Sequence, residues 1–136
     1  MTVDLIVRGG RVVTDGHRIE ADVVVDDGWV TGLVRDSSHL TADRVVNARG
    51  RIVIPGLIDP HTHWGVFNLP DLDAFAEQCE TESSSSLAGG VTTVMHCAMD
   101  KGSYLARLPK LAERVESRAG VDVAFYPALT SLEQVA

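Results

Sequence analysis

The sequence has few cysteines, no long apolar run and no cluster of basic residues, and each absence excludes a class of protein. Cys79 and Cys97 are the only two cysteines, without a Cys-x-x-Cys spacing, so neither a disulfide framework nor a zinc–thiolate cluster is expected. No apolar run approaches the roughly 20 residues of a membrane span, and the N-terminus does not have the pattern of a signal peptide. The net charge of −7 argues against nucleic-acid and anionic-membrane partners. We therefore expect a cytoplasmic protein with reduced thiols.

Common catalytic motifs are missing as well. The sequence contains no P-loop and no Gly-x-Gly-x-x-Gly, and its spacing suggests neither a Ser-His-Asp nor a Cys-His arrangement. Any chemistry in this chain must therefore rest on its histidines.

What is present is the composition of a globular protein, 45% hydrophobic, with a change of rhythm near residue 55. Residues 1–54 read as short strands, with hairpin turns predicted at Gly9-Gly10 and Asp27-Gly28. Residues 55–136 alternate between strand and helix, which predicts βαβ units with a parallel sheet. The expected strands are 57–58, 91–97 and 121–129, and the expected helices are 71–88 and 103–119. Two domains, 1–54 and 55–136, are the resulting expectation.

Three features of the sequence have a local structure that the pattern alone does not settle. The run Ser83 to Ser86 fits a linker or a helix, and we prefer the helix because small residues let it pack closely against a sheet. Pro109 costs about 3 kcal/mol inside a helix, so we expect it at a first helical position after a turn over 104–108. Trp29, in its hairpin, is expected in the core.

The run Pro55 to His63, with the sequence PGLIDPHTH, carries the candidate chemistry. Residues i and i+2 of a strand face the same side, so His61 and His63 should converge on one point. Imidazole is the commonest protein ligand for zinc and similar divalent ions. The pair follows a short apolar strand, at the end where parallel α/β folds place their sites. The sequence therefore predicts a divalent metal site.

These residues resemble a known family. The chain is similar to the N-terminal part of cyclic-amide hydrolases of the amidohydrolase superfamily, most closely the hydantoinase and dihydropyrimidinase group, and less closely dihydroorotase and allantoinase. The resemblance is carried by residues 4–13, 21–23, 46–50, 55–63 and 88–94. It implies an α/β fold in which a small N-terminal β-sandwich (1–54) precedes the first strands and helices of a TIM (β/α)₈ barrel (55–136). Since that barrel needs about 250 residues, we expect the chain to be an N-terminal fragment that is inactive alone.

The resemblance also implies an activity. Such enzymes open a cyclic amide with a hydroxide bound to a divalent metal, here expected to be zinc and binuclear in the full-length enzyme. His61 and His63 match the first-strand ligands. A carboxylated lysine, two further histidines and an aspartate would come from later strands, so no catalytic residue is assigned within this chain. The expected partner is a small cyclic amide, and the full-length enzyme is expected to be a homo-oligomer.

Other candidate site residues surround the pair. Asp59 is expected to accept a hydrogen bond from a ligand imidazole, with capping of the following turn as the alternative. Trp64, Phe67 and Asn68 follow the ligands and are expected to shape the substrate pocket, with ordinary packing as the alternative. His96, at the end of the second barrel strand, is expected to face the substrate or support a ligand, with a core histidine as the alternative.

Two classes of function stay open. The first is a hydrolase, and the second is a non-catalytic, dihydropyrimidinase-related assembly protein; retention of His61 and His63 favours the hydrolase. Among hydrolases, dihydroorotase, allantoinase and, more distantly, a single-metal deaminase are alternatives. Residues 64–67 offer no arginine for a substrate carboxylate, so an uncharged or apolar-substituted cyclic amide is preferred.

Overall fold

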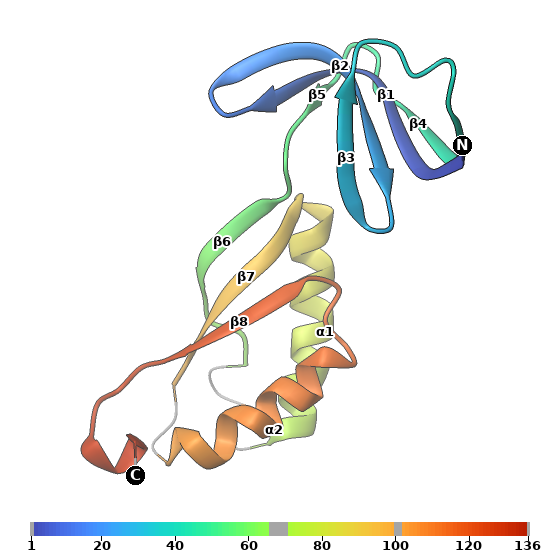
Figure 1. Cartoon of the computed structure of the whole chain (residues 1–136). Helices are drawn as coiled ribbons and strands as arrows, with labels where there is room; N and C mark the ends of the chain where they lie inside the picture. The colour runs from blue at the N-terminus through green and yellow to red at the C-terminus, as the bar shows by residue number, and fades with distance from the viewer. Residues whose placement is uncertain (1, 66–70, 100–101, 136) are drawn as a thin grey trace. The chain divides into compact units, whose positions relative to one another are not determined.

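A computed structural model describes residues 2–65, 71–99 and 102–135 (Figure 1). The chain divides into two compact units, Met1–Pro55 and Gly56–Ala136. Among the described residues, the first unit contains strands and no helix, and the second combines strands and helices. In the described ranges, no helix is both long and apolar enough to cross a membrane.

The first unit is a five-stranded sheet built around its first strand. The strands are β1 (Thr2–Thr14), β2 (His17–Asp26), β3 (Trp29–Val34), β4 (Thr41–Asn47) and β5 (Ile52–Val53). The order is β3-β2-β1-β4, and β5 also pairs with β1. β1 is antiparallel to β2 and parallel to β4 and β5. The predicted turn at Asp27-Gly28 is confirmed, since both residues have positive φ and join the antiparallel strands β2 and β3.

β1 runs unbroken through Gly9 and Gly10, so the hairpin predicted there is wrong. Its pairing with β2 shifts between Val7 and Gly10, and Gly9 has a φ of 73°, which together describe a bulge. The turn lies instead at Asp15 and Gly16, with φ of 40° and 76°. A bulge and a turn both favour glycine at positive φ, so the glycine pair alone does not distinguish them.

Two small apolar clusters lie against this sheet. Their buried members are Val3, Ile6 and Val24 in one and Val12, Ala21 and Val23 in the other. Trp29 belongs to neither and is 76% exposed, so its predicted core position is wrong. It opens the edge strand β3 beside the hairpin turn, beyond the reach of both clusters.

Asp22 ties the bulge of β1 to the segment that follows β3. Its Oδ1 accepts a hydrogen bond from the Gly9 N–H at 2.7 Å, and its Oδ2 accepts from the N–H and hydroxyl of Ser37 at 3.0 and 2.6 Å. Burial pushes the pKa of Asp22 upward, but these hydrogen bonds and the nearby Arg8 guanidinium outweigh it and hold the pKa below 3.8. A buried carboxylate therefore fixes three segments of the first unit.

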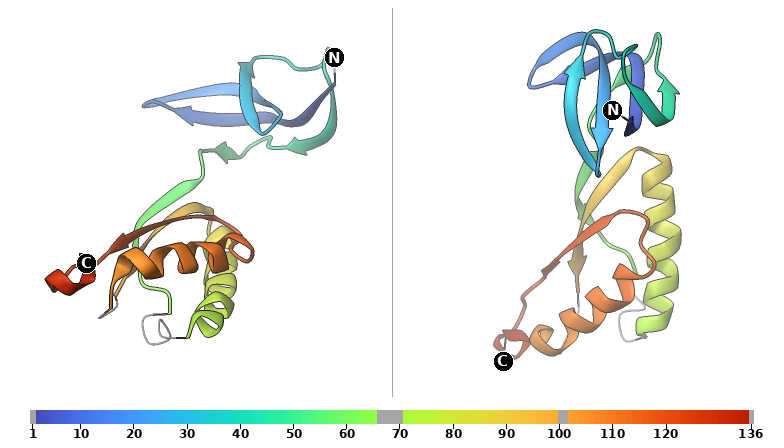
Figure 2. Two further views of the ribbon diagram at one scale, coloured as in Figure 1. Left: turned by 60° about the horizontal axis from the view of Figure 1, so that its bottom comes forward. Right: turned by 45° about the vertical axis from the view of Figure 1, so that its right-hand side comes forward.

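The second unit is a three-stranded parallel sheet with two helices. Its elements are β6 (Leu57–Thr62), α1 (Leu72–Ala88), β7 (Val91–Ala98), α2 (Tyr104–Glu116), β8 (Asp122–Pro127) and the short 3-10 helix η1 (Leu132–Val135). The strand order is β6-β7-β8, as expected of the βαβ units that the sequence predicts. Both helices pack on one face of the sheet (Figure 2).

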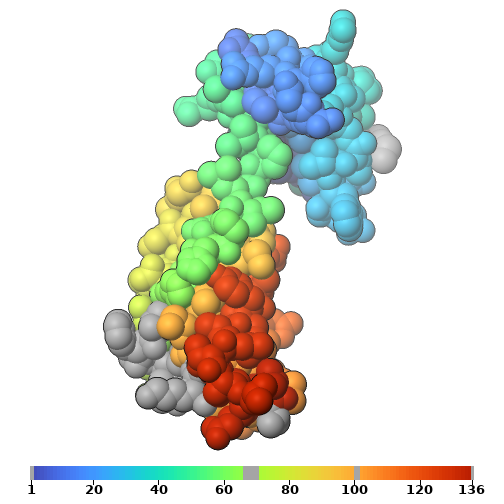
Figure 3. Space-filling view, turned by 90° about the vertical axis from the view of Figure 1, so that its left-hand side faces the viewer, coloured from blue at the N-terminus to red at the C-terminus, as the bar shows by residue number. Residues whose placement is uncertain are grey.

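That face holds the core of the second unit. Its buried residues are Trp64, Phe75, Cys79, Val94, Leu111 and Val115. Burial raises the pKa of the free Cys79 thiol to about 11, so this thiol is protonated near pH 7. Away from this core, β6 runs along the surface (Figure 3), where Ile58 is 66% exposed. The sheet is therefore covered on one side, while apolar side chains such as Ile58 remain open to solvent.

The helix α1 is capped at its start and contains the serine run. Asp71 Oδ1 accepts hydrogen bonds from the N–H groups of Asp73 and Ala74, both at 3.1 Å. Ser83–Ser86 lie inside the helix, which confirms the helical prediction, and each hydroxyl donates to a carbonyl three or four residues earlier. Ser83 is fully buried, and its Oγ accepts from the Gly120 N–H at 3.0 Å.

Pro109 lies well inside α2, which begins at Tyr104, so the predicted turn over 104–108 is wrong. Tyr104, Leu111 and Val115 are the buried residues of this helix. Their burial against the sheet outweighs the local cost of the proline, which removes one helical hydrogen bond.

Candidate metal centre

His61 and His63 meet at the C-terminal end of β6. His61 belongs to the strand, which ends at Thr62, and His63 follows it. Their Nε2 atoms are 2.7 Å apart, and their rings lie 4.5 Å apart at an angle of 77°. Both side chains are exposed. Two imidazole nitrogens thus converge on a point that solvent can reach.

β8 adds a tyrosine to this pair. The Tyr126 hydroxyl shares a short hydrogen bond with Nδ1 of His61. In the β7–β8 register Tyr126 lies opposite Cys97. Burial, the Cys97 contact and the charge of Asp59 raise the pKa of Tyr126 above its ordinary value. Tyr126 is therefore a neutral phenol near pH 7.

Sequence reasoning did not include Tyr126 among the site residues. A signal existed, because the predicted strand 121–129 ends nearby and the C-terminal ends of parallel strands meet at one edge of a sheet. Which residue of the strand faces His61 depends on the register between β7 and β8, and a one-residue slip would turn Tyr126 to the other face.

Asp59 contacts the backbone of the pair. Its Oδ1 accepts a hydrogen bond from the His61 N–H at 3.1 Å. The β6–β7 register shifts between Asp59 and Thr62, which interrupts the strict alternation that the sequence suggested. Within the described ranges its carboxylate accepts this backbone hydrogen bond and none from an imidazole, as the capping alternative describes.

Trp64 and His96 lie in the core behind the pair. Their rings stack at 6.1 Å, and Nδ1 of His96 accepts a hydrogen bond from the Trp64 N–H at 3.1 Å. Phe75 and Phe125 enclose the imidazole, whose Nε2 has no partner among the described residues. Burial, with a further contribution from His63, lowers the pKa of His96 to about 4. Both side chains are therefore packed in the core, as in the alternative interpretation given for each of them from the sequence.

The donor set supplies part of a metal site. Imidazole nitrogens suit zinc and similar divalent ions, and catalytic zinc sites use three protein ligands. In the part of the chain that the structure describes, no group of three or more His, Cys, Asp or Glu side chains could hold a metal. Phe67 and Asn68, the other predicted pocket residues, lie outside the described residues. His61 and His63 therefore fit a divalent ion as two ligands of a larger set.

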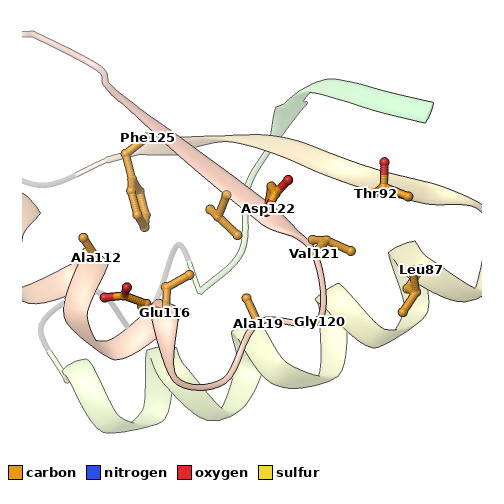
Figure 4. Close-up of a pocket in the computed structure, with 11 residues that line it drawn as sticks. Leu87, Thr92, Ala112, Glu116, Ala119, Gly120, Val121, Asp122 and Phe125 are labelled. Carbon is orange, nitrogen blue, oxygen red and sulfur yellow. The ribbon is translucent and has the colours of Figure 1, made fainter. Parts of the chain in front are cut away.

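A groove of about 620 Å³ lies elsewhere on the second unit, between the helices and β8 (Figure 4). Leu87, Thr92, Glu116 and Asp122 are among the residues that line it. Thr92 and Asp122 stand near the beginnings of β7 and β8, whereas Tyr126 stands near the end of β8. The groove is therefore separate from the histidine pair.

Comparisons with curated sequences and with solved structures give matches to the same group of enzymes. No protein-family model matches the chain. The D-hydantoinase of Streptomyces coelicolor is 30% identical over an alignment of 141 residues, which covers 98% of this chain and 30% of that protein. The dihydropyrimidinase of Rattus norvegicus is 38% identical over 108 residues, covering 74% of this chain and 20% of that protein. Dihydroorotases and an allantoinase are also similar.

Solved structures give the same result. The L-hydantoinase from Arthrobacter aurescens matches with a TM-score of 0.80 at 30% identity, over 92% of this chain and 28% of that one. A D-aminoacylase structure concerned with a binuclear metal centre matches with a TM-score of 0.52 at 31% identity, over 69% and 18%. The chain thus spans less than a third of the length of these relatives, in their N-terminal part.

Proposed function

Because the chain is homologous to the N-terminal part of cyclic amidohydrolases of the amidohydrolase superfamily, we propose that it supplies the first two metal ligands of an enzyme that opens a cyclic amide by hydrolysis. The observation that carries the proposal is the convergence of the Nε2 atoms of His61 and His63 at the end of β6. The relatives alone indicate the class of enzyme, and the pair indicates where its chemistry begins.

The ion proposed for the pair is divalent, with zinc as the first candidate because both donors are imidazole nitrogens. A bound ion of this kind supplies Lewis acidity, which lowers the pKa of a water molecule and polarises an amide carbonyl. His61 and His63 would hold it through Nε2, and a binuclear centre would need further ligands. The D-aminoacylase with a binuclear metal centre supports this extension.

We further propose that residues 1–54 form the β-sandwich segment and residues 55–136 the first three strands of a (β/α)₈ barrel. Active sites of such barrels lie at the C-terminal ends of the strands, which is where His61 and Tyr126 lie. Later strands would supply the remaining ligands. The 136 residues alone are therefore proposed to be inactive, and catalysis, oligomerisation and a cytoplasmic location are proposed for the enzyme that includes those strands.

The proposed substrate is an uncharged or apolar-substituted cyclic amide. Residues 64–67 carry no arginine that could bind a substrate carboxylate. A dihydroorotase-like or allantoinase-like activity is the alternative among enzymes, and relatives of both kinds match the chain. A non-catalytic assembly protein is the alternative outside enzymes, and the convergence of the two imidazoles argues against it.

Metal titration of the 136-residue chain tests the proposal. We expect Co²⁺ and Zn²⁺ to bind in a 1:1 ratio, with affinity falling more than about 10-fold in His61→Ala and in His63→Ala, because each variant removes one of two ligands. His17→Ala and His39→Ala are matched controls, since both residues are exposed and lie in the first unit. Equal affinity in the wild type and the His61→Ala variant would refute the proposed ligand pair.

Activity is tested on a polypeptide that also contains the downstream strands. With Zn²⁺ or Co²⁺ present, it should hydrolyse hydantoins or dihydropyrimidines faster than dihydroorotate, and His61→Ala should abolish the hydrolysis. Faster turnover of dihydroorotate would contradict the substrate preference while leaving the class of reaction in place.

A further inference from the structure

Tyr126 contacts the ring of His61 and can determine which of its two nitrogens carries the proton. Its hydroxyl is hydrogen-bonded to Nδ1 of His61, and the β7–β8 register pairs Tyr126 with Cys97. We propose that Tyr126 is a positioning residue that holds His61 as the Nδ1–H tautomer, so that the Nε2 lone pair is free for a metal ion. This inference rests on the proposed role of His61 as a ligand.

The direction of the hydrogen bonds follows from the donors available. A neutral imidazole has one N–H, and the partner of one nitrogen decides which nitrogen carries the proton. A carboxylate can only accept, whereas a neutral phenol can accept at its oxygen and still donate its own proton. If the oxygen of Tyr126 accepts from Nδ1–H of His61, its O–H must donate elsewhere. When Nε2 of His61 holds an ion, the one proton of the neutral ring stays on Nδ1, which then donates to the oxygen of Tyr126.

Histidine ligands of metals usually donate their second N–H to a carboxylate, a carbonyl or water. The nearest candidate carboxylate, Asp59, accepts instead from the backbone N–H of His61. Among the residues that the structure describes, no carboxylate is hydrogen-bonded to the ring of His61 or His63. Tyr126 therefore takes the position that a carboxylate fills in other metal sites.

The tyrosine is held rigidly enough for this task. It lies in the parallel ladder between β7 and β8, and the ladder continues past it with Ala98 opposite Pro127. One residue further on, the Ala128 N–H donates to the Ala98 carbonyl at 2.9 Å. On the opposite face of the strand, Phe125 packs against His96 in the core. Positioning groups on a strand of this kind keep their geometry better than groups on a loop.

The first test is the tautomer of His61 in the metal-free 136-residue chain. Nitrogen-15 NMR of the imidazole, assigned with a His61→Gln variant, should report the Nδ1–H form in the wild type. Tyr126→Phe removes the acceptor and should move His61 toward the Nε2–H form. A wild-type His61 in the Nε2–H form overturns the proposal without any variant, so the test holds even if Tyr126→Phe does not fold.

Tyr104→Phe is the matched control, because it removes a hydroxyl from the same unit. That hydroxyl donates to the Ala98 carbonyl at 2.8 Å and lies within 3.5 Å of the Ala128 carbonyl, away from the hydrogen bond between Tyr126 and His61. The control should leave the tautomer of His61 unchanged.

Zn²⁺ titration separates this inference from the proposed function. Tyr126→Phe should weaken binding between about 10- and 100-fold, and Tyr104→Phe should not. If the wild type and Tyr126→Phe bind Zn²⁺ equally well, the positioning role of Tyr126 is overturned, whereas His61 and His63 remain the proposed ligands. If the wild-type chain binds no Zn²⁺ but the tautomer of His61 still depends on Tyr126, the proposed ligand pair is overturned. The effect of Tyr126 on the tautomer of His61 then stands without it.

Discussion

At the scale of single residues, His96 is a titratable group that folding keeps neutral. Its ring is fully buried among aromatic side chains, and burial lowers its pKa from 6.5 to about 4. Between these two values the unfolded chain binds a proton that the folded chain does not. The stabilisation from the neutral ring is therefore complete above pH 6.5 and is lost as the pH falls toward 4.

We expect the free energy of unfolding to fall by roughly 1 kcal/mol per pH unit below pH 6.5 because of this group. His96→Asn should flatten the profile, since Asn retains an acceptor for the Trp64 N–H and does not titrate. Urea unfolding at pH 7, 6 and 5 in a chelating buffer measures the difference. His39→Asn, at an exposed histidine, is the control. Parallel profiles for His96→Asn and the wild type would contradict the prediction.

The residues of the candidate site differ in how far the sequence reveals them. The convergence of His61 and His63 could be predicted from their i and i+2 spacing, which is a local property, and it holds although His63 lies just beyond the end of β6. Tyr126 lies 65 residues from His61, and its contact depends on two strand registers that no local pattern specifies. Trp64 and His96 could be placed near the pair but not assigned to the core or the surface, because that choice depends on which helices cover the sheet.

At the scale of elements, α2 contains a proline that its packing tolerates. Pro109 is exposed and interrupts the hydrogen bonds of a helix whose opposite side is buried. We expect Pro109→Ala to raise the free energy of unfolding by about 1–3 kcal/mol, because it restores one hydrogen bond and removes the clash of the ring.

Urea midpoints of the variant and the wild type measure this gain. Lys110→Ala is the control, since Lys110 is the next residue, is also exposed and has a helix propensity close to that of alanine. A lower midpoint for Pro109→Ala would mean that the surrounding turn depends on the proline.

Helices and strands with strong local sequence signals could be predicted. Where the same residues fit two structures, as a glycine pair fits both a turn and a bulge, the sequence could not distinguish them. The helix α1 has Asp71 at its start and glycines after its end, and it was predicted almost to the residue. The strand β1 was divided in two because Gly9-Gly10 resembles a turn. Pairing with β2 and β4 on either side keeps the strand continuous, and β4 lies too far along the chain for a local pattern to include it.

At the scale of the whole chain, the sheet of the second unit has a free edge on each outer strand among the described residues. Among the described residues, β6 and β8 each pair only with β7. Leu57 and Ile58 of β6 are 48% and 66% exposed. Free strand edges and exposed apolar side chains favour association with other chains.

We expect the isolated 136-residue chain to self-associate, with Ile58→Lys weakening the association about 10-fold by placing a charge on the exposed strand. Sedimentation velocity over a range of concentrations measures it. Leu105→Lys is the control, because Leu105 is 69% exposed but lies on α2. A chain that sediments as a 14.6 kDa monomer at every concentration would rule out this association.

The division of the chain at Pro55 also sets an order in time during synthesis. Every partner of β1 has been made once Val53 is added, whereas β6 must wait for β7, which ends at Ala98. At roughly 5–20 residues per second, the interval from the end of β6 to the end of β7 lasts about 2–7 s on the ribosome. The first unit can therefore complete its sheet while His61 is still without Tyr126, which is translated near the end of this segment.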